Sequence, residues 1–400
     1  MFEFIKGKEI IGGISKGVTK SVSSVAGYVK SVDYRSKFVK TKDAVSGLFT
    51  KPEPLPEDLP APMDVVGCVG KLPVYADFIR DNLCAEEALI LDKWVQTGFA
   101  HLSKKRMETF KQMFSRFPHC AFILFGNDSV KAVSGVMVPG KDQSGREYPF
   151  VIFKVIGENY SSKHISLLPL MLSDFRQFAF SLCDEDWASQ DKDTLFARIN
   201  GLPRNEFEVG RGILQNSATG MLEIQTASSF WEVLLPGSGA PQHADFIRTF
   251  NLKINELINL LPEQRNMGIE IMIPDMDDAD TIQLFFVSLV EKMFESCEWR
   301  GQSWVTDFDE KRGRLVLFFR PIETVDFLTL VDREAGLGNV HSITALMGDE
   351  ESAFVEELQL LENPSSTLAD LKDQWVRLQN PEPVIESSDT ETTNIEASEG

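Results

Sequence analysis

A proline-rich spacer near the N-terminus limits how this chain of 400 residues can fold. Residues 51–62 read KPEPLPEDLPAP and contain five prolines. Proline fixes its own φ and pushes the preceding residue toward extended geometry, so neither a helix nor a buried strand can run through this segment. The segment therefore predicts a semi-rigid linker over 51–63, with a head of residues 1–50 before it and a globular body after it.

The charges divide the chain in a similar way. Residues 1–51 hold ten Lys or Arg and four Asp or Glu, whereas residues 349–400 hold two basic and fourteen acidic residues. The formal net charge of the whole chain is -20, and its acidic body argues against nucleic acid as a partner. Residues 380–400 lack aromatic and basic side chains, which predicts a disordered acidic tail that cannot bury enough apolar surface to order itself.

The basic head carries an apolar stripe at helical spacing. The stripe consists of Ile11, Ile14, Val18, Val22, Val25, Val29 and Val32. Its Gly, Ser, Thr and Val content favours helix only weakly, so we expect a helix that forms against a partner. Lysines beside the stripe suit an anionic inner-membrane surface. An unstructured tether, or a helix that docks into a protein groove, is the alternative.

Several other features narrow the class of protein. The five cysteines are widely spaced without a CxxC pair, which excludes a disulfide framework or a cysteine-based zinc site and fits a reducing compartment. The five histidines lack metal-ligand spacing, and we expect no metal and no cofactor. No apolar run approaches the roughly 18 residues of a spanning helix, and the first residues lack the features of a secretory signal. We therefore expect a cytoplasmic protein, peripheral at the inner membrane if the head binds lipid.

The body reads as an α+β or mixed α/β fold. In its first part, short apolar runs predict strands at 120–125, 132–138 and 149–156, with helices at 85–116 and 164–184. In its second part, the pattern predicts strands near 221–235, 267–273, 301–308 and 314–320, and helices near 241–261, 278–296, 350–362 and 366–379. A polar turn at 310–312 between two apolar runs indicates a hairpin.

Three local patterns resemble enzyme motifs but lack essential parts. Residues 13–17 match GxSxG without the strand and helix that a nucleophile elbow needs. Residues 67–72 resemble the end of a phosphate loop, but Val65 and Leu72 replace its first Gly and its hydroxyl residue. The acidic cluster at 275–280 lacks the Gly and distal Glu of a calcium loop, which favours a solvated turn. Catalysis therefore has no positive support, although an enzyme with its site in the second domain is a further alternative.

Two loop segments and one helix carry a distinctive combination of residues. The first segment, GKLPVYADFIR, begins at Gly70, and a helix with Asp92 and Trp94 follows it. The second segment, GVMVPGKDQSGREYPF, begins at Gly135 and reads as a strand, a polar turn and a returning strand.

Together these segments resemble the type VI secretion-associated TagF/ImpM family. The residues that match the family pattern are Gly70, Lys71, Leu72, Pro73, Asp77, Phe78, Asp92, Trp94, Gly135, Pro139, Asp142, Gly145, Arg146 and Pro149. Ala76 stands where the family has Gly, and Gly140 stands where it has Ser, so the loop geometry there can differ. A later stretch, residues 229–236, is similar to a further family segment, with Glu232 in place of its second Trp.

The resemblance implies a non-enzymatic accessory protein of a type VI secretion system that controls apparatus assembly or firing after translation. The implied partners are a forkhead-associated-domain protein and baseplate or membrane-complex components. The implied fold is a longin- or profilin-like α/β sandwich. The predicted organisation is a TagF-like domain at 64–200, a second, smaller α+β domain at 221–335 and C-terminal helices at 336–379. A scaffold that links the secretion machinery to the inner membrane through the head is the alternative function.

The motif residues allow two interpretations. In one, Asp77 and Asp142 cap turns and Arg146 forms a buried ion pair that locks the two loops together. In the other, the loops present a polar surface to a partner. The candidate residues for either role are Gly70, Lys71, Leu72, Pro73, Asp77, Trp94, Asp142, Gly145 and Arg146.

Overall fold

The computed structural model describes part of the chain. The described residues are 65–105, 107–125, 131–157, 165–203, 211–273, 279–294, 299, 302–307, 312–331, 340–343 and 366–379. All of them belong to one compact unit, residues 64–400. The head at 1–50 with its apolar stripe, the linker at 51–63, the helix at 350–362 and the tail at 380–400 lie outside the described residues.

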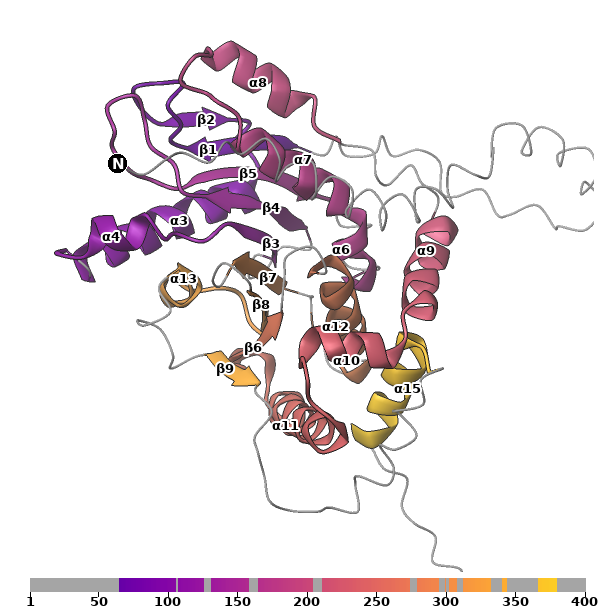
Figure 1. Ribbon diagram of the computed structural model, residues 1–400. Coiled ribbons are helices and arrows are strands. Elements are labelled where there is room, and N and C mark those ends of the chain that lie inside the picture. Colours follow the sequence, from indigo (N-terminus) through magenta and orange to yellow (C-terminus); the bar gives the residue numbers. More distant parts are fainter. Residues whose placement is uncertain are drawn as a thin grey trace, which may run out of the picture. The chain divides into compact units, whose positions relative to one another are not determined.

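A mixed sheet of nine strands runs through the described part of the unit (Figure 1). Its order is β2-β1-β5-β4-β3-β7-β8-β6-β9. The strands are β1 (Val66–Gly70), β2 (Ile79–Asp81), β3 (Cys120–Phe125), β4 (Ala132–Val138), β5 (Phe150–Ile156), β6 (Gly268–Ile273), β7 (Gln302–Asp307), β8 (Gly313–Phe318) and β9 (Val340–Ile343). Neighbouring strands are antiparallel except β6 and β9, which are parallel. The mixed α/β fold predicted from the sequence is confirmed; the longin- or profilin-like detail stays an expectation.

Helices cover both faces of the sheet (Figure 1). In the first half they are α3 (Glu86–Lys105), α4 (Phe110–Phe114), α6 (Leu168–Met171), α7 (Ser173–Cys183) and α8 (Lys192–Asn200), with a 3-10 turn η1 (Ile165–Leu167). In the second half they are α9 (Arg211–Ile224), α10 (Ala227–Leu234), α11 (Ala240–Ile258), α12 (Ala279–Met293), α13 (Thr324–Val331) and α15 (Leu368–Gln379), with a 3-10 turn η3 (Pro262–Gln264).

Strand β3 shows why its sequence is apolar at every position. Phe122 and Leu124 point into a core shared with α3 and α13, whereas Ile123 and Phe125 point into a second core shared with α6 and α12. Successive strand residues face opposite sides of a sheet, so a strand covered on both faces needs apolar residues throughout. The strands predicted from the apolar runs at 120–125, 132–138 and 149–156 are confirmed as β3, β4 and β5.

The two predicted domains contribute strands to one sheet. Strand β3 of the first half pairs with β7 of the second half, from Cys120 with Thr306 to Ile123 with Ser303. The hairpin predicted around 310–312 is confirmed by the pairing of β7 with β8. The division of the body at 200–221 stays a prediction, and the sheet continues across the strands on either side of it.

Two predictions of local structure are wrong. Residues 221–235 are helical, in the end of α9 and in α10, although their apolar and β-branched content suggested a strand. The apolar residues of α10 recur at helical spacing, and Thr226 caps the helix by accepting a hydrogen bond from the backbone N–H of Ser229 at 3.1 Å. Within 336–379, predicted to hold only helices, β9 adds a strand parallel to β6, while α15 confirms the helix at 366–379.

Candidate functional site

The two motif loops leave the same end of the sheet. The first loop, residues 71–78, follows β1, and the second, residues 139–149, joins β4 to β5. Because β5 is antiparallel to both β1 and β4, the C-terminal ends of β1 and β4 lie beside the N-terminal end of β5. We call the exposed charged and aromatic side chains of these loops and of the adjoining β2, namely Tyr75, Asp77, Phe78, Arg80, Lys141 and Arg146, the loop-end surface.

A buried ion pair joins the two loops. The Lys71 ammonium lies 2.8 Å from the Asp142 carboxylate, and the side chains are 6% and 0% exposed. Asp142 also accepts hydrogen bonds from the backbone N–H groups of Ser144 and Arg146, both at 3.0 Å, and from Arg146 Nε at 2.7 Å. Burial alone would raise the pKa of Asp142, but the hydrogen bonds from Lys71 and Arg146 hold this pKa well below its usual range.

Arg146 connects the second loop to the first. Its guanidinium donates a hydrogen bond to the carbonyl of Ala76 at 2.5 Å and lies 3.8 Å from Asp77. The Arg146 side chain is 56% exposed, so this connection is made at the surface rather than in the interior. The structure thus brings together Lys71, Asp142, Arg146 and Asp77. Their role as a lock or as a partner-binding surface stays a prediction, and the geometry is compatible with both.

Two glycines of the motif loops sit where the loop backbones nearly touch. A Cβ atom on Gly70, whose φ is +131°, would lie 2.1 Å from the carbonyl oxygen of Pro149. A Cβ atom on Gly140 would lie 2.1 Å from the carbonyl oxygen of Lys71. Only glycine permits such an approach, so these residues bring the loops together. Gly145, with φ of +77°, closes the turn that begins at Asp142, and no other group lies within 4 Å of its Cβ position.

Two of the candidate residues lie away from the loop-end surface. Leu72 is buried in a core, against β1 and α7. Trp94 is buried on α3, where its indole N–H donates to the carbonyl of Glu323 at 2.6 Å and its ring packs on Trp304 and Phe327. The sequence pattern therefore groups residues that the fold separates into a surface and a core.

Exposed aromatic side chains complete the loop-end surface. The Phe78 ring is 37% exposed and lies 4.8 Å from the Lys71 ammonium and 5.6 Å from the Arg80 guanidinium. Tyr75 is also exposed, and the Lys192 ammonium lies 5.0 Å from its ring. Exposed aromatic rings beside arginine are typical of protein interfaces. Tyr75 was not among the predicted site residues; the signal was the pair of aromatic residues, Tyr75 and Phe78, within one short loop.

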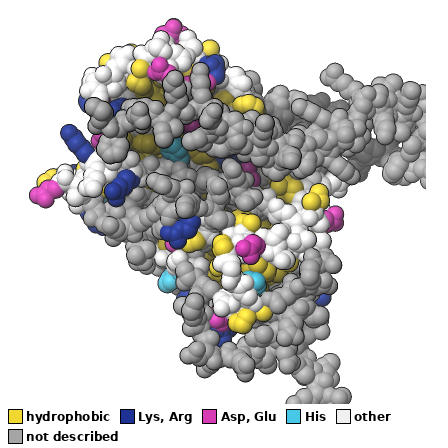
Figure 2. All heavy atoms as spheres, in the orientation of Figure 1, with side chains coloured by type: hydrophobic (Ala, Val, Ile, Leu, Met, Phe, Trp, Pro, Cys, Tyr) yellow, Lys and Arg dark blue, Asp and Glu magenta, His cyan; other side chains and the backbone are white. Residues whose placement is uncertain are grey.

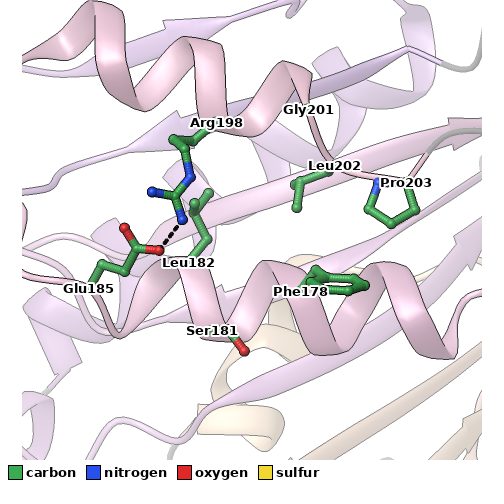
Figure 3. Close-up of a pocket in the computed structure, with 8 residues that line it drawn as sticks. All are labelled: Phe178, Ser181, Leu182, Glu185, Arg198, Gly201, Leu202 and Pro203. Carbon is green, nitrogen blue, oxygen red and sulfur yellow. Dashed lines mark hydrogen bonds and ion pairs between the residues drawn. The ribbon is translucent and has the colours of Figure 1, made fainter.

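The first half also carries a small cavity between α7 and α8 (Figure 3). It has a volume of about 250 Å³ and is lined by Phe178, Ser181, Leu182, Glu185, Arg198, Gly201, Leu202 and Pro203. An ion pair between Arg198 and Glu185 spans one end. Sites for small organic ligands usually have at least about 300 Å³ and several converging polar groups. This cavity therefore offers little for catalysis.

A serine and a histidine meet in the second half. Ser238 Oγ lies 2.9 Å from His243 Nε2, and it also donates to the carbonyl of Leu235 at 2.5 Å. Burial lowers the pKa of His243 to about 4, and its ring stacks on Trp231 at 4.4 Å. Because the Ser238 hydroxyl has a backbone acceptor, the pair serves to close the turn before α11. Among the described residues, no group of three or more His, Cys, Asp or Glu could hold a metal ion.

Neither a membrane-spanning helix nor, on the face drawn in Figure 2, a patch of one charge is found among the described residues. None of the helices in the described ranges combines the length and the apolar character needed to cross a membrane. On the face drawn in Figure 2, the coloured Lys, Arg, Asp and Glu side chains lie singly among hydrophobic and uncharged groups. The described part of this face therefore presents no patch of a single charge.

Comparison with known proteins finds a family model that matches the region of the motif loops. Residues 67–199 match the model of the TagF N-terminal domain, described as type VI secretion system-associated. Among solved structures, PA0076 from Pseudomonas aeruginosa PAO1 is similar, with 21% identity over 34% of this chain and 62% of that chain and a TM-score of 0.31. This chain thus spans about three fifths of that relative. No curated protein matches the chain.

Proposed function

We propose that this protein, whose residues 67–199 form a TagF-like N-terminal domain associated with type VI secretion, controls assembly or firing of the secretion apparatus through protein–protein contacts and without catalysis. The association with type VI secretion rests on the match of residues 67–199 to the TagF N-terminal domain. The regulatory role is our inference from the family resemblance.

The loop-end surface is the proposed docking site. It combines the exposed rings of Tyr75 and Phe78 with the guanidinium groups of Arg80 and Arg146. Aromatic and arginine side chains often supply most of the binding energy of an interface. The Lys71–Asp142 pair and the tight backbone contacts hold the two loops in one conformation, which reduces the entropy lost on binding. We propose that a forkhead-associated-domain protein, or a baseplate or membrane-complex component, docks here.

Affinity purification of the full chain from its native cell tests this proposal. We expect secretion proteins to be recovered with the wild-type chain and to be lost with Tyr75→Ala combined with Phe78→Ala. Leu252→Ala combined with Leu261→Ala removes two exposed apolar side chains elsewhere and is the matched control. Recovery of secretion proteins with all three chains would place the docking site elsewhere, and recovery with none of them would contradict the function itself.

A second candidate function is a scaffold that tethers the secretion machinery to the inner membrane. The apolar stripe and the lysines of the head support it. Co-sedimentation of the full chain with anionic vesicles is the test, with Val22→Asp to place a charge on the stripe. Ser24→Asp adds the same charge off the stripe and is the control. We expect Val22→Asp alone to abolish sedimentation; equal loss with Ser24→Asp would indicate simple charge attraction.

A further inference from the structure

Two buried polar atoms beside the loop-end surface have no hydrogen-bond partner among the described residues. They are Asp92 Oδ1, on α3, and the hydroxyl oxygen of Tyr148, in the second loop. The two residues are only 7% and 6% exposed. A buried polar atom without a partner is costly, and few native proteins keep more than a few of them. Two in one place therefore require an explanation.

Contacts link the two atoms around a single seam. Asp92 lies 3.9 Å from Arg80 Nε, too far for a hydrogen bond. The Arg80 guanidinium lies over the Phe78 ring, and the Phe78 and Tyr148 rings are 4.8 Å apart between centroids at an interplanar angle of 77°. Burial raises the pKa of Tyr148, the Asp92 charge raises it further and Arg80 lowers it, so the three groups share one electrostatic environment.

Phe78 covers this seam from the solvent side. Its side chain is partly exposed, and its ring contacts Tyr148 and the cations of Lys71 and Arg80. Individual contacts of this kind are weak at exposed positions, whereas a deeply buried Phe is held by many more contacts. Phe78 is therefore the side chain that a partner can displace at least cost.

The chemistry of the seam selects the class of group that fits it. Asp92 can only accept a hydrogen bond, and the Tyr148 hydroxyl can donate one. An anion would be repelled by Asp92, and a further cation would compete with Arg80, which already balances that charge. A neutral group with one donor and one acceptor, as in an amide, satisfies both atoms.

We propose that the seam between Phe78, Arg80, Asp92 and Tyr148 binds an amide group of a protein partner, from its main chain or from an Asn or Gln side chain. The amide N–H donates to Asp92 Oδ1, and the amide carbonyl accepts from the Tyr148 hydroxyl once Phe78 has moved aside. The inference deepens the docking role proposed for the loop-end surface and rests on it for the identity of the partner. Binding of an amide group at this seam does not require the docking role to be correct.

A small amide tests the binding chemistry on the full chain without any secretion protein. N-methylacetamide carries the N–H and carbonyl of a peptide group, and methyl acetate has the same shape without the N–H. We expect saturation-transfer NMR to show binding of the amide to the wild-type chain and signals at least about fivefold weaker for the ester, because one hydrogen bond to a charged acceptor contributes roughly that factor or more. Equal signals for amide and ester would overturn the proposal.

Two variants locate the binding. Tyr148→Phe and Asp92→Asn should each reduce the amide signal by about fivefold or more, while Ser228→Ala, which removes an exposed hydroxyl on α10, should leave it unchanged. An amide signal that persists in Tyr148→Phe overturns the proposal. If the amide binds but affinity purification recovers no secretion proteins, the amide site stands and the proposed partner is wrong. If secretion proteins are recovered but the amide does not bind, only the amide site is wrong.

Thermal unfolding separates this proposal from a purely structural role. The Tyr148 hydroxyl has no partner to lose in the free protein, so Tyr148→Phe should unfold at the wild-type temperature or above it. A fall of about 2 °C or more, the size expected for one lost hydrogen bond in a protein of this length, would overturn the proposal by showing that the hydroxyl is already satisfied.

Discussion

The indole N–H of Trp94, in the TagF-like region, donates a hydrogen bond to the backbone carbonyl of Glu323 in the second half, at 2.6 Å. Near this hydrogen bond, Gly98 of α3 packs so close to Phe327 of α13 that a Cβ atom on Gly98 would lie 2.3 Å from the Phe327 ring. Helices α3 and α13 therefore pack closely against each other beside the motif residue Trp94. The motif tryptophan therefore couples the two halves of the body.

Trp94→Ala should lower the free energy of unfolding by about 3–5 kcal/mol, because it empties a buried site between Trp304 and Phe327. Urea unfolding, followed by tryptophan fluorescence and by circular dichroism, measures this change. Trp94→Phe keeps most of the apolar volume and should cost less. Because β3 and β7 pair across the two halves, both probes should report one transition. Two separated transitions would contradict the coupling.

Gly70→Ala should lower the free energy of unfolding by more than about 2 kcal/mol, because the new methyl group collides with the Pro149 carbonyl and the backbone φ of +131° disfavours a side chain. Gly145→Ala is the matched control. Gly145 also has a positive φ, but its Cβ position is open, so its cost should be about 1–2 kcal/mol. Equal losses for the two variants would show that backbone strain, rather than the close approach of the loops, sets the cost.

The acid stability of the unit should depend on His243. Its pKa is about 4 in the folded protein, below the value near 6.5 of an unfolded chain. The unfolded chain therefore binds more protons between these values, and stability falls as the pH drops from 6.5 to 4, by at most about 1.4 kcal/mol per pH unit from this group. His243→Gln should flatten the pH dependence of urea midpoints relative to the wild-type chain. Parallel curves for the two chains would contradict this assignment.

Arg146→Ala should abolish partner recovery in affinity purification while the chain still unfolds cooperatively. The side chain is more than half exposed, so the expected fall in unfolding temperature is only about 2–4 °C. Arg146→Lys keeps the charge but cannot reproduce the contacts of Arg146 with both Asp142 and the Ala76 carbonyl, and it should restore little binding. A large loss of stability in Arg146→Ala would instead favour the locking role.

The strands were predictable where burial on both faces leaves a continuous apolar run, as in β3 and β5. The strand predicted near 221–235 is wrong because aromatic and β-branched residues occur both in strands and in buried helices, and only tertiary packing decides between them. Strand β9 is four residues long and pairs with β6, so its own sequence holds little signal.

The loop-end surface was predictable in part. The family resemblance, rather than any spacing along the chain, grouped the loops of Lys71, Asp142 and Arg146, and the structure brings these side chains into contact. The partner of Trp94 was not predictable, because the contact with Glu323 joins positions far apart in the chain and no local pattern marks it. The unpartnered state of Asp92 and Tyr148 likewise depends on packing alone.

The pairing of β3 with β7 also imposes an order on biosynthesis. One edge of β3 stays unpaired until β7, about 180 positions later in the chain, has been synthesised. At roughly 5–20 residues per second, synthesis of that stretch takes about 10–40 seconds. Throughout that interval the ribosome-bound nascent chain carries an apolar strand, CAFILF, with one edge open to other strands. The cell must therefore shield this edge during translation, and expression of residues 67–199 alone would leave it open permanently.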